Sequence, residues 1–179
     1  ESIPTQVCEV AKPKCYLYRT NAGAVARLMQ GKSENWRGHL VGGSQETIAF
    51  CQAAEDLQAR LGTNHNELGC FSTWAEVQAY SKEEEGQDLR LMVKLIDEFG
   101  AGAIRDAVRD MPQEDRADFV CCTAHKSKGR EWPSVRLGQD FPTANKLDDA
   151  TRRLVYVACT RAQEELDLTA CPTFIGGYD

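Results

Sequence analysis

The sequence contains no apolar stretch approaching the ~20 residues that an α-helix needs to cross a bilayer, so a transmembrane helix is excluded. Its first residues, Glu1 to Pro4, have neither the basic region nor the apolar core of a signal peptide. Basic residues are also fewer than acidic ones: the sequence has 21 Lys and Arg and 27 Asp and Glu, which gives a net charge of −6. This balance argues against a globally basic nucleic-acid-binding protein, although it allows a locally basic groove.

Metal-binding and disulfide patterns are absent as well. The eight cysteines never occur in a C-x-x-C pair, and the three histidines, His39, His65 and His125, are far apart. Structural zinc sites need closely spaced ligand pairs, so no metal site is expected. Most cysteines lie inside apolar runs, and we interpret them as small core residues of a protein in the reducing cytoplasm.

The sequence also lacks the main elements of nucleotide hydrolysis. It contains no G-x-x-x-x-G-K-[ST] segment, the loop whose backbone amides hold the phosphates of a nucleotide. No Ser-His-Asp set or carboxylate pair stands out either. The 179 residues, 42% of them hydrophobic, are enough for one globular domain with its own core. Alone, this chain is expected not to hydrolyse nucleotide.

Short apolar runs alternate with helical patterns at both ends of the chain. Cys15 to Tyr18 is an expected strand, Asn21 is the expected cap of the next helix, and residues 31–38 are an expected loop. Phe119 to Cys122 is a continuous apolar run, typical of a strand buried on both faces, and Pro133 to Gly138 is the next expected strand. Strands alternating with helices at these lengths predict an α/β fold with a parallel sheet flanked by helices.

Helical periodicity dominates the middle of the sequence. The apolar face of its first helix extends to Leu61, and Thr73 and Glu76 are spaced as in a capping box that opens another helix. We therefore predict one domain over residues 1–179 with a mostly helical insertion over about 44–110.

The first candidate site is the segment from Thr123 to Trp132, T-A-H-K-S-K-G-R-E-W. It follows an expected buried strand, and open α/β sheets bind ligands beyond the carboxyl ends of their strands. Gly129 gives the backbone freedom to turn. The cations Lys126, Lys128 and Arg130 and the hydroxyls of Thr123 and Ser127 suit phosphate oxygens, and Glu131 offers an acceptor for a ribose hydroxyl. Trp132, beside these cations, is the aromatic residue that could stack on a base of a single strand. A solvated loop whose lysines only keep the surface polar fits the spacing equally well.

The second candidate site lies in an expected helix from Asp148 to Ala162, within R-R-L-V-Y-V-A-C-T-R-A. Arg153 and Arg161 are spaced so that both lie near one helix face. A guanidinium in this position either meets a phosphate, as in phosphoryl transfer, or forms an ion pair. The spacing alone favours ion pairs, with the acidic neighbours Asp148, Asp149, Glu164 and Glu165 as partners.

Three segments, in this order along the chain, resemble the motifs of superfamily 1 DNA helicases of the UvrD/Rep type. Leu17 to Ala22, L-Y-R-T-N-A, is similar to a strand-to-helix segment that the family writes L-Y-R-S-N-A. Thr123 to Trp132 resembles motif V, T-x-H-x-[SA]-K-G-x-E-[FW], and Arg152 to Ala162 resembles motif VI, R-R-L-x-Y-V-x-x-T-R-A. The helical middle, which begins after Val41-Gly42-Gly43, is similar to the branch that contains the F-box DNA helicases.

The resemblance implies the second RecA-like domain of a larger ATP-dependent DNA helicase. Its cofactors would be ATP and Mg²⁺, bound together with an N-terminal RecA-like domain of the same polypeptide, and its partner would be single-stranded DNA. Arg161 would be the catalytic arginine finger on the γ-phosphate, with Gly129 and Glu131 beside the nucleotide. The residues implied to contact DNA are Thr123, His125, Lys126 and Lys128.

Two features depart from the family pattern. The Gln-x-x-Arg segment that opens the second domain is missing, and Ala150-Thr151 replaces the acidic pair before the motif VI arginines. The alternative function is therefore a non-catalytic, helicase-derived module that binds DNA or protein, and the missing phosphate loop keeps this alternative open.

Overall fold

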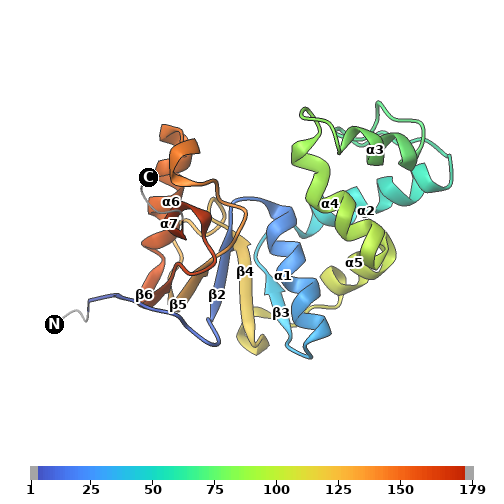
Figure 1. Ribbon diagram of the computed structural model, residues 1–179. Coiled ribbons are helices and arrows are strands. Elements are labelled where there is room, and N and C mark those ends of the chain that lie inside the picture. The colour runs from blue at the N-terminus through green and yellow to red at the C-terminus, as the bar shows by residue number, and fades with distance from the viewer. Residues whose placement is uncertain (1–3, 176–179) are drawn as a thin grey trace. The chain divides into compact units, whose positions relative to one another are not determined.

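The computed structural model describes residues 4–175 and divides into two compact units. The first, here called the sheet unit, consists of Glu1–Gly42 and Pro112–Asp179. The second, here called the helical unit, is Gly43–Met111. Along the chain, the helical unit thus interrupts the sheet unit (Figure 1).

A parallel sheet forms the centre of the sheet unit. Its strands are β1 (Gln6–Val7), β2 (Cys15–Tyr18), β3 (Gly38–Leu40), β4 (Phe119–Thr123), β5 (Trp132–Leu137) and β6 (Ala162–Asp167). Their order is β1-β6-β5-β2-β4-β3, and Cys15 of β2 lies opposite both Val120 and Val135. The prediction of a RecA-like α/β fold with a parallel sheet is therefore confirmed, whereas β1, only two residues long, gave no periodic signal in the sequence.

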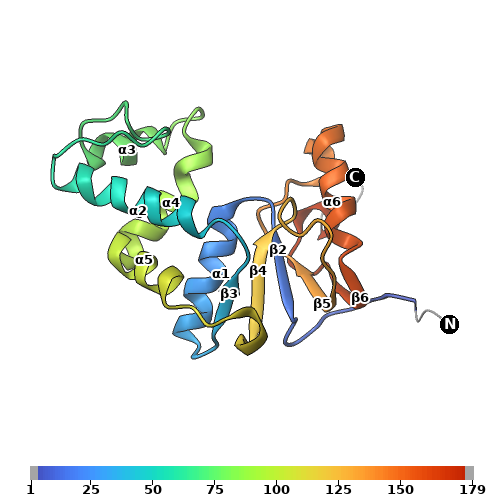
Figure 2. The ribbon, with the colours of Figure 1, turned by 180° about the vertical axis from the view of Figure 1, so that it is seen from behind.

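Helices cover both faces of this sheet. They are α1 (Asn21–Ser33), α6 (Asp149–Cys159) and α7 (Pro172–Ile175), with 3₁₀ turns η1 (Glu114–Arg116) and η2 (Ala144–Lys146). The crossovers β2-α1-β3 and β5-α6-β6 run in opposite directions along the sheet, so right-handed connections place α1 and α6 on opposite faces. Figures 1 and 2 show α1 beside β3 and β4, and α6 beside β5 and β6.

The side chains of β2 alternate between these two faces, as expected for a strand. Leu17 packs toward α6, in one core with Val155 and Ala158. Tyr16 packs toward α1, where the guanidinium of the buried Arg27 lies 4.7 Å from the centre of its ring. Both faces of the sheet are therefore buried, which explains the continuous apolar runs in the sequence.

Thr20, and not Asn21, caps helix α1. The Oγ1 atom of Thr20 accepts a hydrogen bond from the N–H of Gly23 at 3.1 Å. The same hydroxyl donates to Oδ2 of Asp140 at 2.7 Å, which fixes it at the start of the helix. The prediction for Asn21 was wrong by one residue because the carboxylate that holds Thr20 is distant in the sequence.

Helix α1 also continues further than predicted. It ends at Ser33, so the start of the expected loop over residues 31–38 is helical. A Cβ atom at Gly31 would lie 2.6 Å from the ring of Phe119, so glycine is needed here for close packing against β4. Glycine disfavours helix, so Gly31 suggested the start of a loop. The glycine is present because of the packing against Phe119 and not because the helix ends there.

The helical unit contains α2 (Ser44–Gln58), α3 (Trp74–Tyr80), α4 (Gln87–Phe99) and α5 (Ala101–Arg109). Thr73 caps α3 as predicted, with its Oγ1 accepting from the N–H of Glu76 at 3.4 Å. An ion pair between Glu55 and Arg105 joins α2 to α5. Leu61, expected on the apolar face of α2, lies beyond the end of that helix and is 77% exposed.

Candidate functional site

The residues between β4 and β5, 124–131, form a connection that we call the basic turn. Thr123, which precedes it, lies opposite Tyr18 at the carboxyl ends of β4 and β2. Trp132, which follows it, lies opposite Ala162 at the amino ends of β5 and β6. Because all strands are parallel, the basic turn runs from the carboxyl edge of the sheet to the amino edge. The prediction that the segment from Thr123 to Trp132 lies beyond the carboxyl ends of the strands is therefore correct only for the beginning of that segment.

Two hydroxyl groups hold the basic turn together from inside. Ser127 is fully buried and its Oγ donates to the carbonyl oxygen of Ala124 at 2.7 Å. Thr123 is 7% exposed, and its Oγ1 accepts from the N–H of Lys126 at 3.3 Å. These hydroxyls, predicted to suit phosphate oxygens, are used to shape the turn. The contact of Thr123 with DNA stays a prediction.

Arg161 lies in the connection between α6 and β6, because α6 ends at Cys159 and not at Ala162. Its guanidinium donates from Nε to the carbonyl oxygen of Val157 (3.0 Å), from Nη1 to that of Arg130 (3.1 Å) and from Nη2 to Oγ1 of Thr160 (3.0 Å). All three acceptors are uncharged. Within residues 4–175, no carboxylate forms an ion pair with Arg161.

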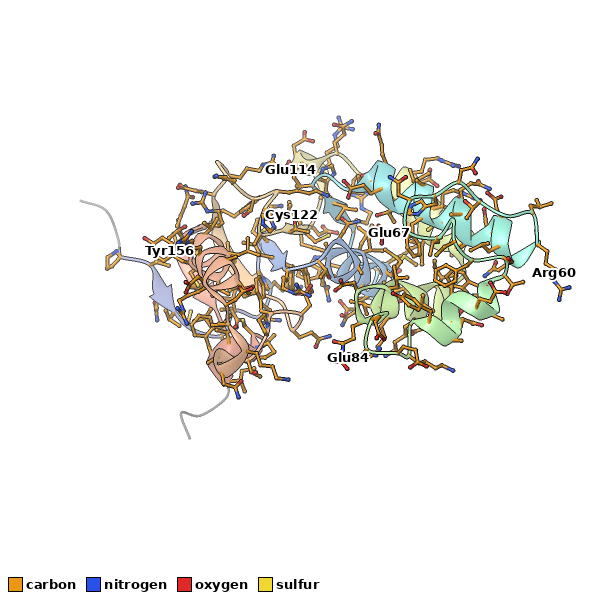
Figure 3. All side chains as sticks on the ribbon, turned by 90° about the horizontal axis from the view of Figure 1, so that it is seen from above. Arg60, Glu67, Glu84, Glu114, Cys122 and Tyr156 are labelled. Carbon is orange, nitrogen blue, oxygen red and sulfur yellow. The ribbon has the colours of Figure 1, made fainter. Side chains whose placement is uncertain are left out.

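The end of the basic turn is fixed next to Arg161. Nη2 of Arg130 lies 2.7 Å from Oε2 of Glu114, a residue labelled in Figure 3. Gly129 has φ of +79°, the left-handed region that glycine adopts without strain. Glu131 is exposed, and its Oε2 accepts from Nε2 of Gln163 at 3.3 Å. The three residues predicted to contact nucleotide, Gly129, Glu131 and Arg161, are thus brought together toward the amino edge of the sheet.

The other two motif arginines differ in their partners. Nη1 of Arg152 lies 3.0 Å from Oδ1 of Asp149, in an exposed ion pair. Arg153 forms no ion pair or side-chain hydrogen bond with any residue of the described range. Asp148 caps α6 instead, and the hydrogen bonds from Thr151 hold the pKa of Asp148 below its usual value. The ion-pair interpretation of this helix therefore applies to Arg152 alone among the three arginines.

A shallow cavity of about 190 Å³ lies between the basic turn and α6, and we call it the cationic cavity. Its basic lining consists of His125 and Lys128 from the turn and Arg153 from the helix. The rest of its wall is apolar and comes from Ala124, Ala150, Leu154 and Val157. No pattern in the sequence could indicate that Arg153 joins the basic turn, because the two segments meet only in the fold.

Lys126 and Trp132 do not join this cavity. Lys126 is half-buried and extends over Gly42, so that a Cβ atom there would lie 2.9 Å from its Cδ. Gly42 follows β3, on the other side of β4 from β5. Trp132 is 6% exposed and belongs to the core between the sheet and α6. The interpretation of Trp132 as a residue that stacks on bases was therefore wrong.

The segment L-Y-R-T-N-A has a structural role at the carboxyl end of β2. Oδ1 of Asp140 accepts from the N–H of Arg19, and Oδ2 accepts from that of Thr20, both at 2.8 Å. A Cβ atom at Gly138 would lie 2.2 Å from the ring of Tyr18, and burial raises the pKa of that tyrosine. These contacts account for Tyr18 by packing and, with the cap described above, for Thr20.

The negative charge of the chain is concentrated in the helical unit. Of the 27 acidic residues, 13 lie in Gly43–Met111, which holds only 6 of the 21 basic residues. The sheet unit therefore holds the other 15 basic and 14 acidic residues and is close to neutral. The overall charge of −6 consequently says little about the surface that contains the basic turn.

The cysteines are mostly inaccessible. Cys15, Cys121 and Cys122 are fully buried in the sheet, and Figure 3 shows Cys122 inside the sheet unit. Burial raises the pKa of Cys159 to about 11, whereas Cys70 is exposed. In the described part of the chain, no group of three or more His, Cys, Asp or Glu residues is arranged to hold a metal ion. No helix within residues 4–175 is long and apolar enough to span a membrane.

Comparisons with known proteins match the segments just described. A family model described as UvrD-like helicase C-terminal domain matches residues 118–169, from β4 through β6. The chain is similar to F-box DNA helicase protein 1 of Schizosaccharomyces pombe, with 31% identity over 148 residues, or 70% of this chain and 17% of that protein. It is also similar to ATP-dependent DNA helicase Rep of Escherichia coli, with 35% identity over 117 residues, or 60% of this chain and 16% of Rep.

Proposed function

The chain belongs to the UvrD-like helicase C-terminal domain family, and on this premise we propose that it is the second RecA-like motor domain of an ATP-dependent DNA helicase. In this proposal the domain covers residues 1–179, with the helices over about 44–110 as an insertion. It supplies an arginine finger to ATP hydrolysis and contacts to single-stranded DNA, and together these drive translocation and unwinding.

The geometry of Arg161 is the observation that carries the proposal. An arginine finger must offer its positive charge to a transferred phosphoryl group, and a carboxylate partner would compete for that charge. Arg161 is oriented by two carbonyl oxygens and one hydroxyl and keeps its full charge. These bonds also limit the conformations of its side chain, which lowers the entropy cost of meeting a phosphate.

ATP would bind between this domain and an N-terminal RecA-like domain of the same polypeptide. Gly129, Glu131 and Arg161 fit the nucleotide because they combine an open backbone turn, an exposed acceptor for a ribose hydroxyl and an uncompensated cation. Residues 4–175 contain no carboxylate cluster suited to a metal, so Mg²⁺ would take its protein ligands from the other domain. When bound, the Mg²⁺–nucleotide supplies the phosphoryl group that this domain's Arg161 stabilises.

Single-stranded DNA would lie toward the other end of the basic turn. Thr123 marks the carboxyl edge of the sheet, and the predicted DNA contacts at His125, Lys126 and Lys128 follow it directly. The same eight-residue turn ends beside Arg161. This connection supports a motor in which DNA and nucleotide act on two ends of one element.

The test is ATP hydrolysis by the full-length protein with Arg161→Ala. We expect kcat to fall by about 10³ to 10⁵, the range for arginine fingers, while affinity for single-stranded DNA stays within about twofold. Arg152→Ala is the matched control, since Arg152 lies in the same motif but is already paired with Asp149.

Two results would contradict this assignment. Hydrolysis within about tenfold of the unchanged protein would show that Arg161 is not the finger and would favour the non-catalytic binding module. An equal loss of activity in Arg152→Ala would show that the motif acts through folding and not through charge at the phosphate.

A further inference from the structure

The cationic cavity brings together three basic side chains that have no acidic partner. His125, Lys128 and Arg153 are all exposed, and within the described residues none of their side chains forms an ion pair or hydrogen bond. They come from two different elements, the basic turn and α6. The charges of Lys128 and Arg153 repel one another when they share one cavity, so an anion that enters it relieves this repulsion, and the ring of His125 offers an N–H donor beside them.

Acidic residues of the same domain do not fill this role. Asp149 is paired with Arg152, and Asp148 caps the first turn of α6. Glu131 lies beyond Gly129, where it accepts a hydrogen bond from Gln163. The nearest carboxylates in sequence are therefore engaged elsewhere, which leaves the cavity open to an anionic ligand.

The dimensions and the walls of the cavity define the chemistry of that ligand. A volume of about 190 Å³ accommodates a phosphate group with part of a sugar, but it is too small for the drug-sized ligands that fill pockets of roughly 300–1,000 Å³. The apolar wall suits the C–H surface of a sugar, and the three basic groups suit phosphate oxygens.

We propose that His125, Lys128 and Arg153 together bind one backbone phosphate of a single-stranded nucleic acid, with Arg153 as a contact that lies outside the basic turn. The site lies on the α6 side of the basic turn. The inference rests on the proposed function for the identity of the strand, and it adds a specific subsite and a residue that the helicase resemblance does not assign to DNA.

The experiment uses this 179-residue chain and a fluorescein-labelled oligothymidylate, with binding followed by anisotropy at several salt concentrations. A contact to one phosphate of a single strand contributes about 0.7 to the slope of log K against log salt, which corresponds to about fivefold in affinity at 0.1 M salt relative to 1 M. The double variant Arg153→Gln with Lys128→Gln is expected to weaken binding by up to about fivefold at 0.1 M salt and to reduce the slope by up to about 0.7. Arg153→Gln and Lys128→Gln alone are each expected to cause a measurable part of this loss.

Arg152→Gln is the matched control. It removes the same charge from the neighbouring position of the same helix, but Arg152 does not line the cavity. We expect this variant to bind like the unchanged chain. All three positions are exposed, so thermal unfolding should shift little, and this measurement is made in parallel for each variant.

Four outcomes would overturn the inference, and they separate it from the proposed function. Unchanged affinity and slope in Arg153→Gln and Lys128→Gln would reject the subsite while leaving DNA binding intact. Equal weakening by Arg152→Gln would show only a general effect of charge. Displacement of the oligothymidylate by ATP in the unchanged chain, but not in Arg153→Gln, would assign the cavity to free nucleotide. Failure of the unchanged chain to bind any oligothymidylate would also contradict the DNA contacts of the proposed function, but not the role of Arg161 in hydrolysis.

Discussion

Asp167 is a buried carboxylate on which separate segments of the sheet unit converge. It is fully buried at the end of β6. Its Oδ2 accepts from the N–H of Val10 at 2.8 Å and from Nε of Arg136 at 2.9 Å, and its Oδ1 accepts from Oγ1 of Thr169 at 2.6 Å. Burial by itself raises the pKa of Asp167, but the hydrogen bonds outweigh it and hold the pKa below its usual value.

Replacing this carboxylate by alanine should be strongly destabilising. Asp167→Ala leaves Arg136, which is 24% exposed, without its partner, and leaves the N–H of Val10 without an acceptor. Removing one member of a buried ion pair costs about 3–5 kcal/mol. At about 2–4 °C per kcal/mol for a chain of this size, Tm should fall by about 6–20 °C. Asp149→Ala is the control, because its pair with Arg152 is exposed and is worth about 0–1 kcal/mol.

Urea unfolding followed by circular dichroism measures the free-energy cost of Asp167→Ala and of Asp149→Ala. The pH dependence of the free energy of unfolding provides a second check. Because the pKa of Asp167 is lower in the folded than in the unfolded chain, its stabilising effect is complete above the unfolded value of about 3.9 and is lost as the pH falls through the folded value. The difference between the unchanged chain and Asp167→Asn should therefore shrink in acid. A cost below about 1 kcal/mol at pH 7 for Asp167→Ala, or a difference that grows in acid, would refute this reasoning.

Two further predictions concern packing and thiol reactivity. Gly31→Ala should destabilise the chain by about 1–3 kcal/mol despite the higher helix propensity of alanine, because its Cβ would lie 2.6 Å from the ring of Phe119. Gly102→Ala should instead stabilise the chain by about 0.4–1 kcal/mol, because the atom nearest to its Cβ lies 3.5 Å away. The same sign of change for both variants in urea unfolding would contradict the packing argument. Modification of the cysteines by a thiol reagent at pH 8 can be followed by peptide mapping with mass spectrometry. The exposed Cys70 should react first, and Cys121, whose pKa is raised by burial, should react only after unfolding. Equal rates for the two thiols would show that β4 opens in the native state.

The elements that the sequence predicted well are those whose signal is local. The run Phe119–Cys122 predicted a strand buried on both faces, and every residue of β4 is buried. The spacing of Thr73 and Glu76 predicted the start of α3, because a cap depends on residues one turn apart. In these cases the partners that stabilise the element are within a few residues of it, and a pattern in the sequence is sufficient.

The parts that could not be predicted depend on contacts between distant segments. Thr20 is fixed as a cap by Asp140, and Gly31 remains helical because it packs against Phe119. The partners of Arg161 include the carbonyl oxygen of Arg130, and a backbone oxygen has no signature in the sequence. Only the fold decides which arginine meets which acceptor.

The basic turn explains why one short motif can combine residues predicted for two ligands. Its interior is fixed by hydrogen bonds from the N–H of Ser127 to the oxygen of Thr123 and from the N–H of Arg130 to the oxygen of Ser127, both at 3.0 Å, and by the buried hydroxyl of Ser127. A segment with this many internal bonds moves as one body more readily than it deforms. Under the proposed function, a phosphate that pulls on Lys128 would therefore also shift the carbonyl oxygen of Arg130, which holds Arg161. In this proposal, the residues expected to contact DNA lie within the spans closed by these two hydrogen bonds, and the oxygen that holds Arg161 belongs to Arg130, the residue that closes the second of them.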